Sequence, residues 1–434
     1  MMDKNRTFVG FGFGAIQAGL FLYEAFQSGN FARLVVAEVM PDVVAALRGG
    51  GGQSGGFYRV NIAHADRIET AQVGPVQAYD PAHAADRAAL IEAIAQAEEI
   101  ATAVPSVKFY TADSPGSIHR LLAAGLRLKA QRGGPRAVIY AAENHNHAAE
   151  ILQAQVMGEI PGEEQAAVLA QAQFLNTVIG KMSGVVTDAA QIQEQALGTV
   201  TADLPRAFLV EAFNRILISA IHFDPPFERG IRVFSEKSDL LPFEEAKLYG
   251  HNATHALAAY LGAARGAEWI ADLKEIPGAM NFLRRAFIEE SGQALVKKYQ
   301  GVDELFTPAG YEAYADDLLE RMINPFLRDA IERVGRDPER KLGWDDRLIG
   351  TIRLALQQGI AARRYAFGAA AALARIEPQL LTQTISPASL LEGIWKHGAA
   401  DEQSRNEREQ VLALIESAAQ ELRQWRASGF AALD

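Results

Sequence analysis

The stretch of sequence that decides the fold is Thr7–Gly19, TFVGFGFGAIQAG. Thr7–Phe11 is apolar and is predicted to be a buried strand, and the glycines at 12 and 14 follow it directly. Such glycines allow a tight turn and let the backbone approach a phosphate, while the helix that follows offers unpaired N–H groups to an anion. The stretch therefore predicts a dinucleotide-binding turn. The alternative is a tight strand-to-helix turn that binds no ligand.

The glycine pattern fits two registers. In the register that starts at Gly12, Ala15 and Ile16 begin the helix and Gln17 takes the place of the usual third glycine. In the overlapping register, Gly10-x-Gly12-x-x-Ala15, the pattern has the G-x-G-x-x-A form. Both registers place the same backbone turn at the end of the first strand.

The first 205 residues alternate short apolar runs with helical segments. Strands are predicted at Thr7–Phe11, Arg33–Val39, Glu99–Val104 and Arg136–Ala142, and helices at Ala15–Gln27, Pro41–Leu47 and Arg87–Gln96. Uniformly apolar strands that alternate with helices are typical of a parallel sheet covered on both faces. We therefore expect an α/β Rossmann-type parallel-sheet domain over residues 1–205, with a glycine-rich loop at Gly49–Gly56.

Beyond residue 205 the pattern becomes helical. Phe208–Ile221 is an apolar run of uncertain type, and from Pro242 onward a period of about 3.6 residues dominates. Helices are predicted at Ala246–Ala264, Ala279–Tyr299, Tyr311–Val334, Ile349–Ile376 and Glu407–Ala427. The sequence thus predicts an all-α C-terminal domain over residues 206–434.

Composition narrows the class of protein. The 434 residues carry a formal net charge of −11, 22% of them are charged and none is cysteine. This balance is that of a globular chain, and it excludes a disulfide framework and argues against a nucleic-acid partner. The polar start at Met1–Arg6 and the absence of a long uncharged apolar run predict neither a signal peptide nor a membrane span. We expect a soluble, cytoplasmic protein.

Several residues are expected to line the cofactor site. Glu38 ends the second strand, 26 residues after Gly12, where a carboxylate accepts hydrogen bonds from the hydroxyl groups of an adenosine ribose. No Arg or Lys occurs in Val39–Pro41 to bind a 2′-phosphate, so NAD is favoured over NADP. Thr102, Ala103 and Val104 end a later strand and are expected to line the same site, because ligands bind at the carboxyl edge of such sheets.

The catalytic candidates lie in Lys247–His255, which has the spacing K-x4-N-x2-H. On an α-helix Lys247, Asn252 and His255 fall within an arc of about 140°. Oxidation of a secondary alcohol needs a base, and burial lowers the pKa of a lysine toward the working pH. Asn252 is suited to hold the developing oxyanion and His255 a neighbouring hydroxyl. The alternative is a solvated stripe or a histidine of the core.

Asn144 is a second candidate donor, at the end of the Arg136–Ala142 strand. Its alternative role is to cap the helix that begins near His147. His145 and His147 are two residues apart without a third ligand nearby, so we expect no metal.

Together these motifs resemble the polyol-specific long-chain dehydrogenase family, and most closely its mannitol-1-phosphate 5-dehydrogenase branch. The shared features are a G-x-G-x-I-x-x-G turn, an acidic residue at 38, the Thr-Ala-Val strand end, the Glu143-Asn144 pair and the K-x4-N-x2-H helix. Downstream, Glu289–Gly292, Asn324–Asp329 and Glu332–Leu342 resemble the branch that acts on phosphorylated substrates. Gln17, His145 and Asn176 depart from the family's usual residues.

The resemblance implies a Rossmann domain, a helical domain and an active site between them that uses NAD and no metal. Lys247 would be the general acid and base, Asn144 and Asn252 would hold the oxyanion, and His255 would orient the substrate. Glu143 would belong to the cofactor site, and Glu244 or Glu245 would relay protons. The family's substrate phosphate would bind Arg333, Arg336, Arg340 and Lys341, since guanidinium groups match phosphate oxygens. Pairing of these arginines with Asp329, Glu332 or Asp337 is the alternative.

The leading hypothesis is an NAD-dependent oxidoreductase that interconverts mannitol 1-phosphate and fructose 6-phosphate, as a monomer or small homo-oligomer. One alternative is a dehydrogenase of a free polyol or hexuronate from the same family. Another is a non-catalytic NAD-binding sensor, although a sensor needs no lysine to transfer protons.

Overall fold

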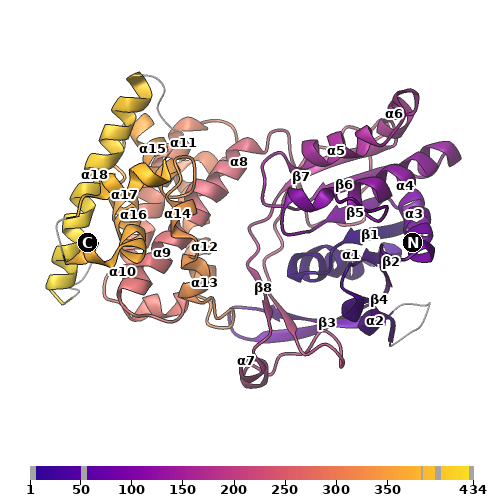
Figure 1. The fold of residues 1–434 in the computed structure, drawn as a ribbon, viewed down its shortest axis with the longest axis horizontal. Coiled ribbons are helices and arrows are strands. Elements are labelled where there is room, and N and C mark those ends of the chain that lie inside the picture. The colour runs from indigo at the N-terminus through magenta and orange to yellow at the C-terminus, as the bar shows by residue number, and fades with distance from the viewer. Residues whose placement is uncertain (1–5, 50–55, 383–384, 396–401, 430–434) are drawn as a thin grey trace. The chain divides into compact units, whose positions relative to one another are not determined.

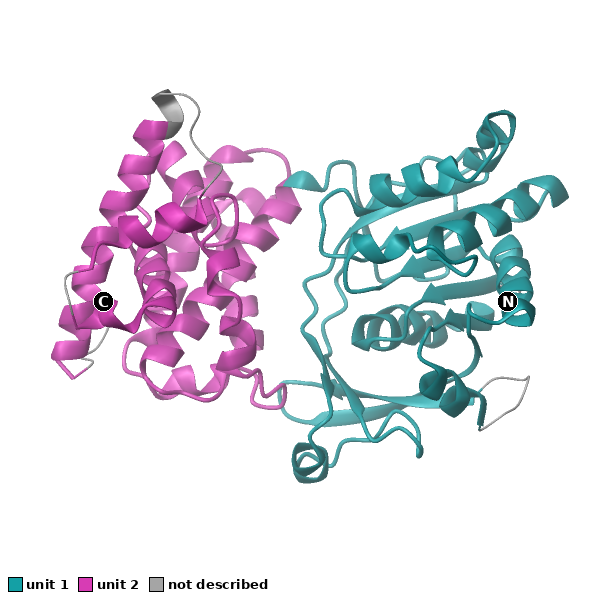
Figure 2. Ribbon diagram, viewed as in Figure 1, with its two compact units in different colours: residues 1–241 teal, residues 242–434 magenta. Residues whose placement is uncertain are grey.

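The computed structural model describes residues 6–49, 56–382, 385–395 and 402–429. The chain forms two compact units, Met1–Leu241 and Pro242–Asp434 (Figure 2). The sequence places the division at 205/206, which is earlier. The difference arises because the segment after residue 205 supplies further strands to the sheet of the first unit. The predicted order of a sheet domain followed by a helical domain is confirmed.

The first unit is built on a mixed sheet, in which the described residues form eleven strands in the order β11-β10-β7-β6-β5-β1-β2-β4-β3-β9-β8 (Figure 1). The strands are β1 (Arg6–Phe11), β2 (Phe31–Ala37), β3 (Gly56–Ala63), β4 (Ile68–Tyr79), β5 (Glu99–Thr102), β6 (Ala137–Ala141), β7 (Ala172–Val178), β8 (Ser183–Val186), β9 (Ala207–Glu211), β10 (Leu217–Ser219) and β11 (Ser235–Lys237). The stretch from β7 to β4 is parallel throughout.

Alternate residues of the central strands enter two separate cores. Phe8, Leu34 and Val138 face one core, whereas Val9, Val35 and Ile139 face the other. This alternation follows from the two-residue period of a strand, and it requires apolar side chains at every position of a sheet covered on both sides. The four predicted strands are confirmed for this reason.

Helices cover both faces of this sheet. The helices of this unit are η1 (Gln17–Leu22), α1 (Tyr23–Ser28), α2 (Pro41–Gly49), α3 (Ala84–Gln96), η3 (Val107–Tyr110), α4 (Ile118–Arg132), α5 (Ala148–Gly158), α6 (Gly162–Leu169) and α7 (Ala189–Glu194). Residues of α3, α4 and α5 belong to one core, and residues of η1, α1 and α2 belong to the other (Figure 1).

The order in which strands are added to the sheet reverses at β1. β1 pairs with β2 on one side and with β5 on the other, so the crossover after β1 and the later crossover into β5 run to opposite sides. Open α/β sheets bind ligands at the carboxyl ends of strands at such a switch point. Gly12 follows the end of β1, and Thr102 is the last residue of β5.

The sequence does not predict seven of the described strands, which are β3, β4 and the five from β7 to β11. β3 and β4 form an antiparallel hairpin, and in the first half of β3 buried and exposed residues alternate. A search for uniformly apolar runs overlooks such a strand. The glycine-rich loop predicted at Gly49–Gly56 lies outside the described residues, except that Gly49 ends α2 and Gly56 begins β3.

The second unit is helical. Its helices are η4 (Ala246–Asn252), α9 (Ala253–Ala264), η5 (Ile270–Glu275), α10 (Ala279–Arg285), η6 (Ala286–Gly292), α11 (Gln293–Lys298), η7 (Glu304–Phe306), α12 (Pro308–Met322), α13 (Ile331–Gly335), α14 (Pro338–Lys341), α15 (Ile349–Gln357), α16 (Arg363–Ile376), η8 (Pro378–Leu381), α17 (Pro387–Ile394) and α18 (Glu402–Ala427). α8 (Leu241–Glu245) leads into η4 from the end of the first unit. α9 is the central helix and packs against α13 and α16.

Two of the predicted helices are interrupted. The stretch predicted as Tyr311–Val334 is divided between α12 and α13, and it contains Pro325 and the positive φ of Arg328. The stretch predicted as Ile349–Ile376 is divided at Gly359, whose φ is +77°. Proline and left-handed glycine both end helices, so these breaks follow from local chemistry. In the described part of the chain, no helix combines the length and the apolarity that crossing a membrane requires.

Candidate active site

The turn after β1 has the backbone that the glycine motif predicts. Gly12 has φ +82°, and its N–H donates a 2.9 Å hydrogen bond to the carbonyl oxygen of Ala37. A Cβ at Gly12 would lie 2.9 Å from the carbonyl oxygen of Ala103, whereas a Cβ at Gly14 would contact nothing within 4 Å. Gly12 therefore lets the ends of β1 and β5 meet, and Gly14 leaves open space at the start of the helix.

Gln17 replaces the third glycine of the fingerprint, and the structure shows how it fits. Its side chain is fully buried against Gly10, where any Cβ would overlap the amide of Gln17. In the usual motif a glycine on the helix allows close packing on the strand. Here the glycine is on the strand and the large residue is on the helix. Neither amide atom of Gln17 has a hydrogen-bond partner among the described residues.

Glu38 follows the end of β2 at the carboxyl edge of the sheet. It is mostly buried, and its Oε1 accepts hydrogen bonds of 2.7 and 2.9 Å from the N–H groups of Val39 and Met40. These bonds fix the carboxylate at the edge where an adenosine ribose is expected.

Glu143 connects the ends of two neighbouring strands. Its carboxylate accepts hydrogen bonds of 2.9 Å from the Thr102 hydroxyl and from the Val104 N–H, and another from Tyr110 Oη. Burial raises the pKa of Glu143, although these donors oppose the shift. Both oxygens of the Glu143 carboxylate thus accept hydrogen bonds from the protein itself. Glu143 holds Thr102–Val104 in place, and the exposed Asn144 follows it at the carboxyl edge.

Lys247 and Asn252 lie within a π-helical turn, η4, rather than in an α-helix. Backbone bonds in a π-helix join residues five apart, so residues at i and i+5 lie on the same side. This spacing is that of Lys247 and Asn252, and His255 follows three residues later on α9. The broad arc expected for an α-helix therefore narrows, because the π-turn aligns the first two members of the motif.

The environment of Lys247 weakens the preference of its amine for the charged form. The pKa of Lys247 is lowered to about 8, mainly because burial disfavours the charged amine and also because Arg347 places a positive charge nearby. The carboxylate of Glu244 acts in the opposite direction. A lysine with this pKa can both accept and donate a proton near neutral pH. Glu245, the other predicted relay, forms a 2.7 Å ion pair with Lys298.

His255 and Arg333 share one carboxylate. Asp329 is almost fully buried, with Oδ2 3.0 Å from Nε2 of His255. Its Oδ1 accepts a 2.9 Å hydrogen bond from Nε of Arg333 and a second one from the same guanidinium. Arg333 is therefore paired in the way that the alternative interpretation predicts.

The remaining predicted phosphate ligands differ in exposure. Arg336 and Arg340 are exposed, and Arg340 is 3.4 Å from Asp346. Lys341 is buried, and its amine donates to the carbonyl oxygen of Arg336. Desolvation lowers the pKa of Lys341 to about 8, assisted by the positive charges of Arg347 and Arg340.

Sequence reasoning missed Arg347. Its Nε donates a 2.8 Å hydrogen bond to Oδ1 of Asp346, and its charge acts on Lys247, Lys341 and His251. The residue lies between α14 and α15, outside any quoted motif. Its only sequence signal is its position six residues beyond the predicted cationic cluster.

Two departures from the family pattern have local structural roles. Oδ1 of Asn176 accepts a 2.8 Å hydrogen bond from the Ala149 N–H, so Asn176 caps the start of α5. His145 and His147 are both exposed, and Nδ1 of His145 accepts from the His147 N–H at 3.1 Å. Among the described residues no cluster of three metal-ligating side chains occurs.

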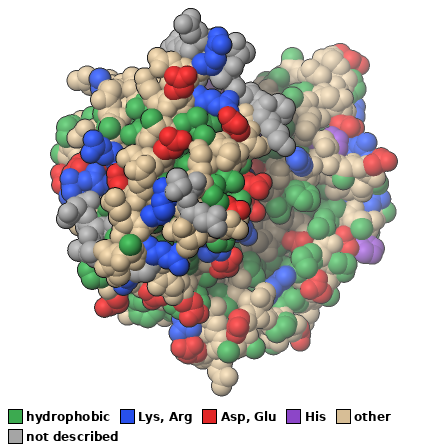
Figure 3. Space-filling view, turned by 60° about the vertical axis from the view of Figure 1, so that its left-hand side comes forward, with side chains coloured by type: hydrophobic (Ala, Val, Ile, Leu, Met, Phe, Trp, Pro, Cys, Tyr) green, Lys and Arg blue, Asp and Glu red, His purple; other side chains and the backbone are tan. Residues whose placement is uncertain are grey.

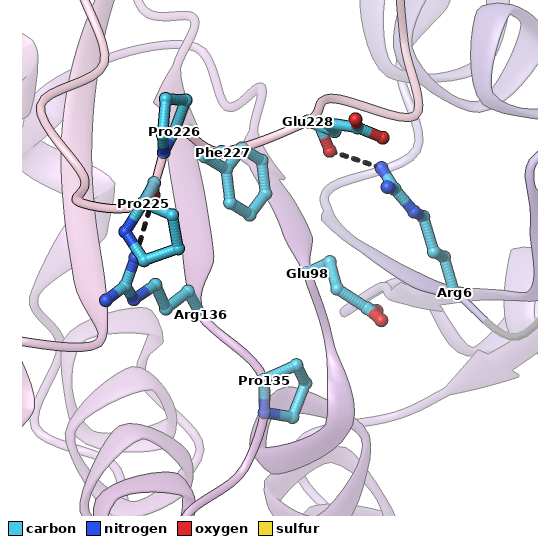
Figure 4. Close-up of a pocket in the computed structure, with 8 residues that line it drawn as sticks. All are labelled: Arg6, Glu98, Pro135, Arg136, Pro225, Pro226, Phe227 and Glu228. Atoms are coloured by element: carbon cyan, nitrogen blue, oxygen red, sulfur yellow. Dashed lines mark hydrogen bonds between the residues drawn. The ribbon is translucent and has the colours of Figure 1, made fainter.

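A pocket of about 420 Å³ lies at the opposite, amino edge of the sheet. Its lining includes Arg6 at the start of β1 and Glu98 and Arg136, each one residue before a strand (Figure 4). Arg6 donates to the carbonyl oxygen of Glu228, and Arg136 donates to that of Pro225 at 2.9 Å. The pocket is therefore separate from the carboxyl ends of β1 and β5. On the face drawn in Figure 3, acidic and basic side chains are interspersed.

Two family models match the chain, the mannitol dehydrogenase Rossmann domain over residues 6–226 and the mannitol dehydrogenase C-terminal domain over residues 239–424. Among solved structures, a D-sorbitol dehydrogenase in substrate-free form is similar with a TM-score of 0.76 and 15% identity, over 99% of this chain and 94% of that one. Pseudomonas fluorescens mannitol 2-dehydrogenase, in a ternary complex with NAD and D-mannitol, is similar with a TM-score of 0.64 and 16% identity. That match covers 99% of this chain and 93% of the other.

Proposed function

Because the chain belongs to the mannitol dehydrogenase family, we propose that it is an NAD-dependent oxidoreductase that interconverts mannitol 1-phosphate and fructose 6-phosphate. The observation that carries the proposal is the position of Lys247 and Asn252 in one π-turn, with the pKa of Lys247 near 8. A partly buried amine with this pKa, beside an amide donor, suits proton transfer to and from a secondary alcohol.

The described residues of the first unit fit NAD. The open space at Gly14, the N-terminus of the helix that follows and the fixed carboxylate of Glu38 match a pyrophosphate and an adenosine ribose. Thr102, Ala103 and Val104 would lie along the bound cofactor, with Glu143 holding them in place. When bound, NAD supplies the acceptor for the hydride that leaves the alcohol carbon.

Lys247 would accept the hydroxyl proton during oxidation and return it during reduction. Asn144 and Asn252 would donate hydrogen bonds to the substrate oxygen, which bears negative charge as the proton leaves. His255 would hold an adjacent hydroxyl and so select the carbon that reacts. Glu244 is close enough to influence the charge of Lys247 and is the candidate for passing its proton to water.

The phosphate assignment is supported by the positive charge around Lys247 and Lys341. Arg347 acts on both amines, and Arg340 acts on Lys341. A free polyol or hexuronate is the second candidate. It is favoured by the pairing of Arg333 with Asp329 and of Lys341 with a backbone carbonyl, because those two groups are already engaged within the protein.

A substrate panel with NADH tests the proposal. We expect the purified full-length chain to reduce fructose 6-phosphate with a kcat/KM at least about tenfold above that for fructose, because phosphate contacts add binding energy. Arg347→Ala should reduce this preference, whereas the matched control Arg426→Ala, at an exposed position of α18, should not. Equal use of both ketoses would assign a free polyol instead. If the protein oxidises NADH with no ketose or hexuronate, the non-catalytic NAD-binding sensor is the hypothesis that remains.

A further inference from the structure

Asp329 is held rigidly in a segment without regular structure between α12 and α13. Its carbonyl oxygen accepts a 2.9 Å hydrogen bond from the Ile270 N–H, and the next residue pairs with Trp269 in an isolated bridge. The preceding residue, Arg328, has φ +45°, and its guanidinium carbon lies over the Trp269 ring, 6.0 Å from the ring centre. A positive φ at a residue other than glycine persists only where surrounding contacts enforce it. The backbone of Asp329 therefore has a fixed position.

The side chain of Asp329 is directed at two groups. Its Oδ2 is 3.0 Å from Nε2 of His255, which is an ion-pair contact rather than a hydrogen bond, because neither atom has hydrogen-bond geometry with any described residue. Its Oδ1 is occupied by the guanidinium of Arg333. Burial by itself would raise the pKa of Asp329, but His255 and Arg333 together hold it below its usual value. The carboxyl group is therefore ionised and can only accept hydrogen bonds.

We propose that Asp329 is a positioning residue that keeps the proton of His255 on Nε2, so that Nδ1 presents a hydrogen-bond acceptor to a substrate hydroxyl. A neutral imidazole has one donor nitrogen and one acceptor nitrogen, and the partner of one nitrogen determines the role of the other. With an ionised carboxylate beside Nε2, the donor is Nε2–H. The proposal rests on the proposed function, in which His255 contacts the substrate.

The arrangement has a consequence for substrate selection. An acceptor at Nδ1 takes a hydrogen bond from a hydroxyl group next to the reacting carbon, whereas a donor would favour a carbonyl oxygen at that position. Arg333 is half-exposed, so its share in fixing Asp329 is smaller than that of the buried contact with His255. The carboxylate, not the guanidinium, is thus the group on which the tautomer depends.

The test compares Asp329→Asn with Glu339→Gln, which removes an exposed negative charge from the neighbouring α14. Nitrogen-15 NMR of histidine-labelled protein, with His255→Gln used to identify the signal, reports the tautomer directly. We expect Nε2–H in the unmodified protein and Nδ1–H, or a mixture, in Asp329→Asn, because an amide can donate to Nε2. Glu339→Gln should leave the signal unchanged.

Kinetics provide the second measurement. We expect Asp329→Asn to lower kcat/KM for the polyol by about tenfold or more, to leave the Kd for NADH within about twofold, and Asp329→Glu to recover part of the loss. A proton on Nδ1 of His255 in the unmodified protein would overturn the proposal, and that result does not depend on whether Asp329→Asn folds. An unchanged tautomer in Asp329→Asn would overturn it as well. If the unmodified protein turns over no polyol, the proposed function fails, while the NMR result still decides the role of Asp329.

Discussion

The carbonyl oxygen of Tyr249, inside the π-turn, accepts a 3.1 Å hydrogen bond from the hydroxyl of Thr351 on α15. The same hydroxyl is also within hydrogen-bond distance of the Arg347 carbonyl oxygen, and Gly350 has no Cβ where the Tyr249 ring lies. These contacts fasten the start of α15 to the turn that carries Lys247. They explain why the charge of Arg347 acts on the Lys247 amine.

Replacing Lys247 by alanine should lower kcat for polyol oxidation by roughly a hundredfold or more, since general acid and base groups contribute about that much. Binding of NADH should remain nearly unchanged, because the residues assigned to the cofactor lie in the first unit. Steady-state kinetics and NADH fluorescence titration measure the two effects. Lys274→Ala, at an exposed lysine of the same unit, is the matched control, and unchanged turnover in Lys247→Ala would exclude the residue as the base.

The pKa of Lys247 predicts opposite pH profiles for the two directions. Oxidation needs the neutral amine, so its kcat/KM should rise with pH through about 8, whereas ketone reduction needs the charged amine and should decline over the same range. Arg347→Ala removes a charge that lowers the pKa of Lys247, so its profile should move to higher pH. Arg347→Lys should stay close to the unmodified enzyme. Profiles that coincide for all three proteins would contradict this electrostatic coupling.

Glu38 should determine the choice between NAD and NADP. In Glu38→Ala/Met40→Arg, the carboxylate that excludes a 2′-phosphate is lost and a guanidinium that binds one is gained. We expect the ratio of kcat/KM for NADP to that for NAD to rise by about tenfold or more. Glu163→Ala, on exposed α6, should leave the ratio unchanged. No shift in the double variant would remove Glu38 from the ribose site.

Gly12→Ala should weaken cofactor binding. The new Cβ would meet the Ala103 carbonyl oxygen at 2.9 Å, and the φ of +82° is unfavourable for alanine by about 1–3 kcal/mol. We expect a lower melting temperature and a weaker affinity for NADH, measured by calorimetry and fluorescence titration. Gly29→Ala, at φ +65° in open surroundings, provides a control for backbone strain alone. Equal effects of both substitutions on NADH affinity would argue against a specific role for Gly12.

Glu99 should make stability depend on pH. Complete burial raises its pKa to about 7, although Tyr140 Oη donates to it at 2.8 Å. Between the unfolded pKa near 4.3 and about 7 the native state binds the additional proton, so stability should fall as pH rises through this interval. Urea unfolding measures the free energy of unfolding of Glu99→Gln and of the unmodified protein. Relative to the unmodified protein, the glutamine variant should become more stable as the pH is raised from 5 to 8. A difference independent of pH would refute the assignment.

The parts of the fold that sequence predicts are those with local signals. Uniformly apolar strands such as Arg136–Ala142 and the glycines at 12 and 14 carry their structure in adjacent residues. The edge strands lack that signal. β10 has three residues, and its place is set by pairing with β7, about forty positions earlier in the chain.

The candidate site shows the same limit. The sequence shows the residue types at Lys247, Asn252 and His255. It does not predict the π-turn that aligns the first two, because no pattern among the neighbouring residues indicates an extra residue in that turn. The contact between His255 and Asp329 joins residues 74 positions apart, and Arg347 acts on Lys247 across 100 positions. Such pairs arise from tertiary packing, which a single sequence does not report.

The reversed fit of Gly10 and Gln17 bears on any attempt to idealise this protein toward a consensus sequence. Restoring glycine at position 17 alone would remove a fully buried side chain and leave an internal void beside Gly10. Only a reciprocal exchange, with a larger residue placed on the strand at the same time, would preserve the volume. The two positions are therefore expected to covary, because the size of the residue at one limits the size of the residue that the other can accept.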